Sequence, residues 1–177
     1  LNARLMIVGQ DWGDVTYFRK NRGLDDLRNP TMRTLEELLA SIGVDAPLDR
    51  YGRESRGVYL TNAILCLKTG GLQAPVQAEW VTNCATRFLR KQVELVLPRA
   101  VVPLGQRAYQ ALCGAFQIRP QPFRRAVENE AVQLLADTSM VPVYHCGNRI
   151  LNTHRGKRQQ IVDWQRIRSV LGYSSDA

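Results

Sequence analysis

The chain has 177 residues, of which 45% are hydrophobic and 23% are charged, so its composition excludes a disordered tail or fibrous repeat and suits one folded core. No apolar run approaches the roughly 20 residues of a membrane helix, and the sequence has no secretion signal. Lys and Arg number 24 against 16 Asp and Glu, and this net charge of +8 favours a polyanionic partner such as nucleic acid, although a basic surface can also serve solubility. We therefore expect a soluble, cytoplasmic monomer with no membrane partner.

The first half of the chain predicts two strands separated by a helix. Leu5–Val8 is a short continuous apolar run that a glycine ends, as in a strand buried on both faces. Residues 11–31 are polar and without a clear period, which predicts a long loop, whereas apolar residues spaced three and four apart predict a helix over about 32–42. A charged loop is expected over 45–57, followed by a second strand over Val58–Ile64.

The second half continues the alternation of strands and helices. We expect helices over about 75–97, 105–116 and 156–171, and strands over 100–104, 132–137 and 141–145, the last two joined by an Asp-Thr-Ser turn. This alternation is typical of α/β proteins with a parallel sheet. The sequence predicts a three-layer α/β/α sandwich with a central four-stranded, mainly parallel sheet, formed by residues 1–177 as a single domain. Because the first strand follows Leu1 so closely, the natural protein is expected to begin further upstream.

Three polar residues of different kinds follow three of the predicted strands. Asp11 comes after the first strand, Asn62 ends the second and His145 ends the last. Ligands of open parallel sheets bind outside the carboxyl ends of the strands, so these side chains are expected to meet at one edge. Each alone could be an ordinary polar loop residue, but the three together favour a site.

A carboxylate, an amide and an imidazole in one cleft fit a hydrolysis that passes through charged species. The carboxylate can orient water or stabilise a developing cation, the imidazole can donate to an oxygen that gains negative charge, and the amide can read the edge of a heterocycle. No serine lies in a G-x-S-x-G turn, which argues against a serine hydrolase. The segment after the first strand lacks the lysine of a phosphate-binding loop, and no partner pair gives His145 and Cys146 zinc-site spacing.

These motifs resemble those of the uracil-DNA glycosylase superfamily. Gly9-Gln10-Asp11 is similar to its water-activating motif, Leu60-Thr61-Asn62-Ala63 to its base-reading strand end, and His145 to its catalytic histidine. The layout is closest to the iron–sulfur branch, family four, in features that run in order along most of the chain: Cys66, Cys84, Phe88-Leu89, Gln92 and Val101–Gly105.

The resemblance implies a role for each matching residue. Asp11 would orient the attacking water and stabilise the cationic sugar, Asn62 would read the uracil edge, and His145 would stabilise the leaving base. Gly9 and Gln10 would help to hold that base. A flipped base also needs an aromatic ring beneath it, for which Phe18 is preferred and Tyr17 is the alternative.

The chain departs from the family pattern after His145 and after Asp11. Cys146-Gly147 stands where the family has Pro and Ser, and Trp12 stands where the iron–sulfur branch has Pro-Tyr. The basic stretch that follows is expected to bind DNA phosphates through Asn148, Arg149, Arg155, Lys157 and Arg158. The alternative is a solvated basic helix face.

The cysteines bear on the choice of branch. Cys66 and Cys84 match two of four iron–sulfur ligands, and the other two in that branch lie upstream of the first strand, beyond Leu1. A cluster of this kind needs four thiolates, so the chain as given cannot complete one, and inert buried thiols are the alternative. Neither Cys113 nor Cys146 is a sensible replacement. No cofactor is needed for the chemistry itself.

The sequence therefore predicts a DNA-repair glycosylase that flips uracil, or a related deaminated base, out of single- or double-stranded DNA and hydrolyses its N-glycosidic bond. A second hypothesis is a non-catalytic or covalently trapping module that binds uracil or single-stranded DNA on the same fold. A third is an enzyme of free nucleosides, against which the basic charge argues.

Overall fold

A five-stranded sheet forms the centre of the computed structural model, which describes residues 3–23, 26, 28–45, 57–68, 70–71 and 74–173. Its strands are β1 (Leu5–Gly9), β2 (Val58–Asn62), β3 (Ala100–Pro103), β4 (Val132–Leu135) and β5 (Thr138–Met140). They lie in the order β2-β1-β3-β5-β4, with β4 antiparallel to β5 and every other pair parallel. The strand ends that carry the predicted site therefore meet at one edge.

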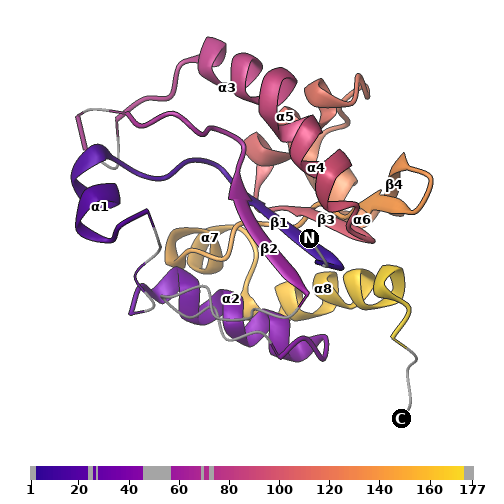
Figure 1. The fold of residues 1–177 in the computed structure, drawn as a ribbon. Helices are drawn as coiled ribbons and strands as arrows, with labels where there is room; N and C mark the ends of the chain where they lie inside the picture. The colour runs from indigo at the N-terminus through magenta and orange to yellow at the C-terminus, as the bar shows by residue number, and fades with distance from the viewer. Residues whose placement is uncertain are drawn as a thin grey trace.

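Helices cover both faces of the sheet, as Figure 1 shows. One face is covered by α2 (Pro30–Ser41) and α8 (Lys157–Leu171), and the other by α3 (Ala78–Cys84), η1 (Ala85–Leu89), α4 (Arg90–Val96) and α5 (Gln106–Ala115). Strand β1 shows why both faces are buried: Leu5 and Ile7 belong to the core under α2 and α8, whereas Met6 and Val8 belong to the core on the opposite face. The predicted three-layer α/β/α sandwich is confirmed.

The sheet has five strands rather than the predicted four, and its last strand lies earlier than expected. The turn is formed by Ala136 and Asp137, so Thr138 and Ser139 belong to β5 instead of to the turn. Pro142 has no N–H to donate, which interrupts a regular ladder over 141–145. The chain still follows β3 there, because Val141 N–H donates to the carbonyl of Val101 at 2.9 Å.

Three short helices lie where none was expected, and one long helix is interrupted. They are α1 (Val15–Lys20), within the predicted loop 11–31, α6 (Phe123–Glu128) and α7 (Asn148–Thr153). Each has six residues, too few to show a helical period. The helix predicted from residue 75 begins at Ala78, and η1 is a π-helical segment between α3 and α4. Most of the predicted loop 45–57 falls outside the described residues.

Within the described part of the chain, no helix is long and apolar enough to cross a membrane.

Candidate active site

The carboxyl ends of the parallel strands open into a cleft of about 1070 Å³. It is lined by Gly9–Gly13 after β1, by Asn62 at the end of β2, by Gly105 after β3 and by His145 beyond β5. The structure thus brings together Asp11, Asn62 and His145, which are far apart in the sequence. This is the place where parallel sheets bind ligands.

Gly9 and Asn62 are direct neighbours in the register of β1 and β2. A Cβ atom at Gly9 would lie 2.3 Å from Oδ1 of Asn62, so the amide occupies the space that a side chain would need. The two segments stay hydrogen-bonded beyond the strands. Ala63 N–H donates to the carbonyl of Gly9 at 2.9 Å, and Ile64 N–H donates to that of Gln10 at 3.0 Å. Asn62 therefore lines the cleft in the space that Gly9 leaves free.

Asp11 receives three donors at its carboxylate. Oδ1 accepts from the backbone N–H of Gly13 at 2.7 Å, and Oδ2 accepts from Nε2 of Gln10 at 2.7 Å. The Lys68 ammonium lies 3.4 Å from Oδ2, and the two charged side chains are only 5% and 9% exposed for Lys68 and Asp11. The side chain of Gln10, expected to hold the base, thus contacts the carboxylate in this structure.

His145 is held in the tautomer that suits a donor. The backbone N–H of Gly147 donates to Nδ1 at 2.9 Å, so the neutral ring carries its proton on Nε2. Burial lowers the pKa of His145 below its usual 6.5, which keeps the ring neutral at neutral pH. A Cβ at position 147 would lie 2.9 Å from Nδ1, so glycine is required for this approach.

Cys146 links the histidine loop to α2. Its thiol is fully buried and donates to the carbonyl of Thr31 at 3.6 Å. Burial raises the pKa of Cys146 to about 12, so the thiol stays protonated at neutral pH. At the position where the family pattern has proline, this chain therefore has a structural thiol.

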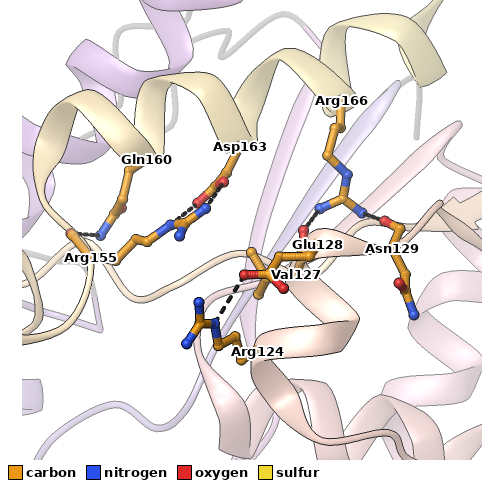
Figure 2. Close-up of polar contacts among 8 residues, drawn as sticks. All are labelled: Arg124, Val127, Glu128, Asn129, Arg155, Gln160, Asp163 and Arg166. Atoms are coloured by element: carbon orange, nitrogen blue, oxygen red, sulfur yellow. Dashed lines mark hydrogen bonds and ion pairs between the residues drawn. The ribbon is translucent and has the colours of Figure 1, made fainter.

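Helix α8 holds the histidine loop from behind. Nε2 of the fully buried Gln160 donates to the carbonyls of His145 and Arg155, each at 3.2 Å. Arg155 in turn makes a two-bonded ion pair with Asp163, at 2.9 and 2.6 Å (Figure 2). The same figure shows Arg166 of α8 donating to the carbonyls of Val127 and Asn129, which ties α8 to α6.

The structure separates the residues expected to bind DNA. Asn148 and Arg149 are exposed and line the cleft. Lys157 is half-exposed and forms an ion pair with Glu37 of α2, and Arg158 is exposed on α8 outside the cleft lining. Arg155 is engaged by Asp163 and lies over the ring of Tyr144, 5.9 Å from its centre. Only the first two therefore adjoin the cleft.

The two aromatic candidates also differ in place. Tyr17 lines the cleft, and its hydroxyl accepts from the backbone N–H of Asp26 at 3.1 Å. Phe18 is not among the lining residues; its ring packs edge-on against Trp12, with centroids 5.9 Å apart, and against Gly23. Trp12 itself lines the cleft. The cleft lining therefore includes Tyr17, the alternative candidate, and not Phe18, the preferred one.

Cys66 and Cys84 lie beside each other near the site. Cys66 is exposed, and partial desolvation together with the neighbouring Cys84 thiol raises its pKa. Cys84 is buried and its sulfur accepts from the N–H of Leu65 at 3.5 Å. Among the residues that the structure describes, no group of three or more His, Cys, Asp or Glu side chains could hold a metal.

The sequence pattern of one family, the uracil DNA glycosylase superfamily, matches residues 1–167 of this chain. The chain belongs to this superfamily. A relative from Pyrobaculum aerophilum, the Type-5 uracil-DNA glycosylase, is 32% identical over 116 residues, which cover 63% of this chain and 49% of the relative. The chain thus spans about half the length of this curated relative. The superfamily predicted from the strand-end motifs is confirmed.

Sequence reasoning missed Lys68, which lines the cleft, and Gln160, which supports the histidine loop from behind. Lys68 lies in an irregular stretch after β2, 57 residues from Asp11, and Gln160 looks like any polar residue of a basic helix. A hint for Lys68 was its place six residues after Asn62, close to the same strand end. For Gln160 there was no comparable signal.

Proposed function

We propose that this protein hydrolyses the N-glycosidic bond of uracil, or of a related deaminated base, after that nucleotide has flipped out of DNA into the cleft. The observation that carries the proposal is the meeting of Asp11, Asn62 and a neutral His145 at the strand ends of a superfamily member. Inside stacked DNA the glycosidic bond is hidden from the protein. The nucleotide must therefore flip out of the stack before its base can enter such a pocket.

Each side chain has a task in this reaction. The carboxylate of Asp11 orients the water that attacks the sugar carbon and offsets the positive charge that grows on the sugar. The Nε2–H of His145 donates to the base oxygen that becomes negative as the bond breaks. The amide of Asn62 offers an acceptor and two donors, which can pair with the donor and acceptor edge of uracil. Tyr17 stacks on the base.

DNA is the proposed partner, in keeping with the net charge of +8. Arg149 and Asn148, at the start of α7, adjoin the cleft and would contact phosphates beside the flipped nucleotide. Arg158 would add to this binding from α8, whereas Arg155 and Lys157 are engaged by Asp163 and Glu37. Action as a monomer in the cytoplasm stays a prediction.

An iron–sulfur cluster would have a structural role outside the reaction. Cys66 and Cys84 supply two adjacent thiols, which fit half of a four-cysteine site. The described residues supply no third ligand beside them. Two thiolates from outside these residues would be required, so no step of the reaction is assigned to a cluster.

A binding module that retains uracil or single-stranded DNA without turnover is the second candidate. It is favoured by one observation, that Cys146-Gly147 occupies the position of the family's Pro and Ser after His145. The buried thiol is unreactive at neutral pH, so any covalent capture would fall to another residue of the cleft.

The experiment incubates the protein with single- and double-stranded oligonucleotides that contain one uracil, then cleaves abasic sites with alkali. Free deoxyuridine and cytosine-containing DNA serve as controls. Strand cleavage that depends on uracil supports the proposal. Tight binding without cleavage would instead support the binding module, and release of uracil from deoxyuridine alone would support a nucleoside hydrolase.

A further inference from the structure

A buried lysine faces the same cleft, and the reaction described above gives it no task. The side chain of Lys68 lines the cleft although it is only 5% exposed. Lysine is almost never buried to this extent unless its ammonium is paired, because removing a charge from water is costly. Here the partner is the carboxylate of Asp11, at 3.4 Å. The ion pair therefore lies at the centre of the proposed chemistry.

The backbone fixes Lys68 beside the loop that carries Asp11. Lys68 forms a parallel bridge with Asp14, and its carbonyl accepts from the N–H of Val15 at 3.3 Å. Asp14 then caps α1, because its Oδ1 accepts from the N–H of Tyr17 at 2.7 Å. The ammonium is therefore placed by a docked segment and not only by its own flexible side chain.

The donors around Asp11 leave one acceptor position open. An ionised carboxylate has about four lone-pair positions, two on each oxygen. Gln10 and Lys68 occupy Oδ2, whereas Gly13 alone donates to Oδ1 among the described residues. The remaining position is thus on Oδ1.

We infer that Lys68 is a positioning residue for the proposed glycosylase reaction: its ion pair with Oδ2 fixes the Asp11 carboxylate so that Oδ1 holds the attacking water. This inference rests on the proposed function.

Lys68 acts through Asp11 and does not attack the sugar. Its side chain is more buried than the carboxylate with which it pairs, and its Nζ lies 3.4 Å from Oδ2 of that carboxylate. A nucleophilic lysine would have to be neutral and would form a Schiff base with the aldehyde of the abasic product. That chemistry gives a covalent adduct that borohydride traps, which provides a direct test against the positioning role.

The test is a double-mutant cycle on single-turnover uracil excision, with wild type, Lys68→Met, Asp11→Asn and the double variant. Lys68→Met keeps the length of the side chain and removes its charge, and it should lower the rate by about 10- to 100-fold, as small misplacements of reacting groups do. Affinity for abasic product DNA should not change. In the Asp11→Asn background, Lys68→Met should change the rate by no more than a factor of about two. The exposed Lys91→Met is the matched control and should retain the wild-type rate.

Three results would overturn the inference while leaving the proposed function intact: a wild-type rate in Lys68→Met, a further large loss in the double variant, or a borohydride-trapped adduct that disappears in Lys68→Met. Lys68→Met leaves the Asp11 carboxylate buried without its ion-pair partner. If this variant does not melt cooperatively, the rates of Asp11→Asn and of the double variant are compared instead, because neither of these two proteins contains that carboxylate. An inactive wild type would overturn the proposed function itself, and this role with it.

Discussion

At the scale of single residues, contacts hold in place each of the three side chains to which we assign a role in the reaction. Asn62 is held where only a glycine at position 9 leaves room, and His145 is held by the N–H of Gly147. The carboxylate of Asp11 is held by a backbone N–H, an amide and an ammonium. Preorganised groups of this kind need little rearrangement during the reaction, which is how enzymes stabilise developing charge.

Gly9→Ala tests the close approach of Asn62. The new Cβ would lie 2.3 Å from Oδ1 of Asn62, so the amide must leave the position in which we propose that it contacts the base. We expect the single-turnover rate on uracil-containing DNA to fall by about 100-fold, while the preference for uracil over cytosine weakens. Gly114→Ala, inside α5 with open space around it, is the control and should retain both. An unchanged rate in Gly9→Ala would show that Asn62 need not occupy this position.

The partly buried His145 predicts a dependence of stability on pH. Its pKa in the folded state is lowered by burial, so the unfolded chain binds a proton more readily than the folded one. The neutral ring contributes fully to the free energy of unfolding above the pKa of histidine in the unfolded chain, about 6.5. This contribution is lost as the pH falls from there through the lower pKa of the folded state. Urea denaturation at pH 7.5 and 5.5 should show this loss in wild type, with a smaller loss in His145→Asn. The only other histidine, His154, is exposed, and His154→Asn should behave as wild type does.

At the scale of elements, α8 supports the site although none of its residues lines the cleft. Gln160 joins α8 to the carbonyl of His145, and the ion pair of Arg155 with Asp163 joins the same helix to the segment before it (Figure 2). The Cys146 thiol joins the loop to α2 on the same face of the sheet. The histidine loop is therefore anchored to both helices of one layer.

Gln160→Met tests this anchor. The substitution keeps an unbranched buried side chain but leaves the carbonyls of His145 and Arg155 without their donor. It also removes the amide oxygen Oε1, which has no hydrogen-bond partner among the described residues, so the net loss in free energy of unfolding should be about 1–2 kcal/mol. Urea denaturation measures it, with the exposed Gln159→Met as control. Equal stabilities of the two variants would mean that Gln160 does not anchor the loop.

The sequence predicted those parts of the site that follow from sheet geometry. Asp11, Asn62 and His145 could be brought together because each follows an apolar run and parallel strands end at one edge. Lys68 and Gln160 could not, because Lys68 pairs with a residue 57 positions earlier and the period of the helix around Gln160 does not show which carbonyls its side chain contacts. Helix α1 was not predicted for a related reason: none of its six residues is buried, so the sequence shows no apolar period there. The last strand was placed too late because the residues Thr138 and Ser139 suit a turn as well as a strand.

At the scale of the whole molecule, only some of the positively charged side chains lie at the cleft. The net charge is +8, yet Lys157 and Arg155 are engaged in ion pairs that hold α8 to its surroundings. Arg149 and Arg107 are both exposed and line the cleft, where we propose that a phosphate beside a flipped nucleotide binds. Binding of DNA should therefore depend on salt through a few residues near the cleft.

Arg149→Ala should weaken binding to all DNA sequences alike and reduce the slope of log affinity against log salt concentration by about one. Fluorescence anisotropy of labelled single-stranded DNA over a salt series measures this slope. Arg87→Ala, exposed on η1 and outside the cleft lining, is the matched control and should leave the slope unchanged. The same slope in Arg149→Ala as in wild type would place the DNA elsewhere on the surface.

The single-turnover rate of uracil excision by wild type and by His145→Ala, measured on one uracil-containing oligonucleotide, tests the central claim most directly. Removing a preorganised donor to a developing oxyanion costs about 100- to 1000-fold in rate. Wild type should therefore release uracil and His145→Ala should be slower by this factor, while both bind abasic product DNA equally well. An inactive wild type, or a variant that excises uracil at the wild-type rate, would contradict the account.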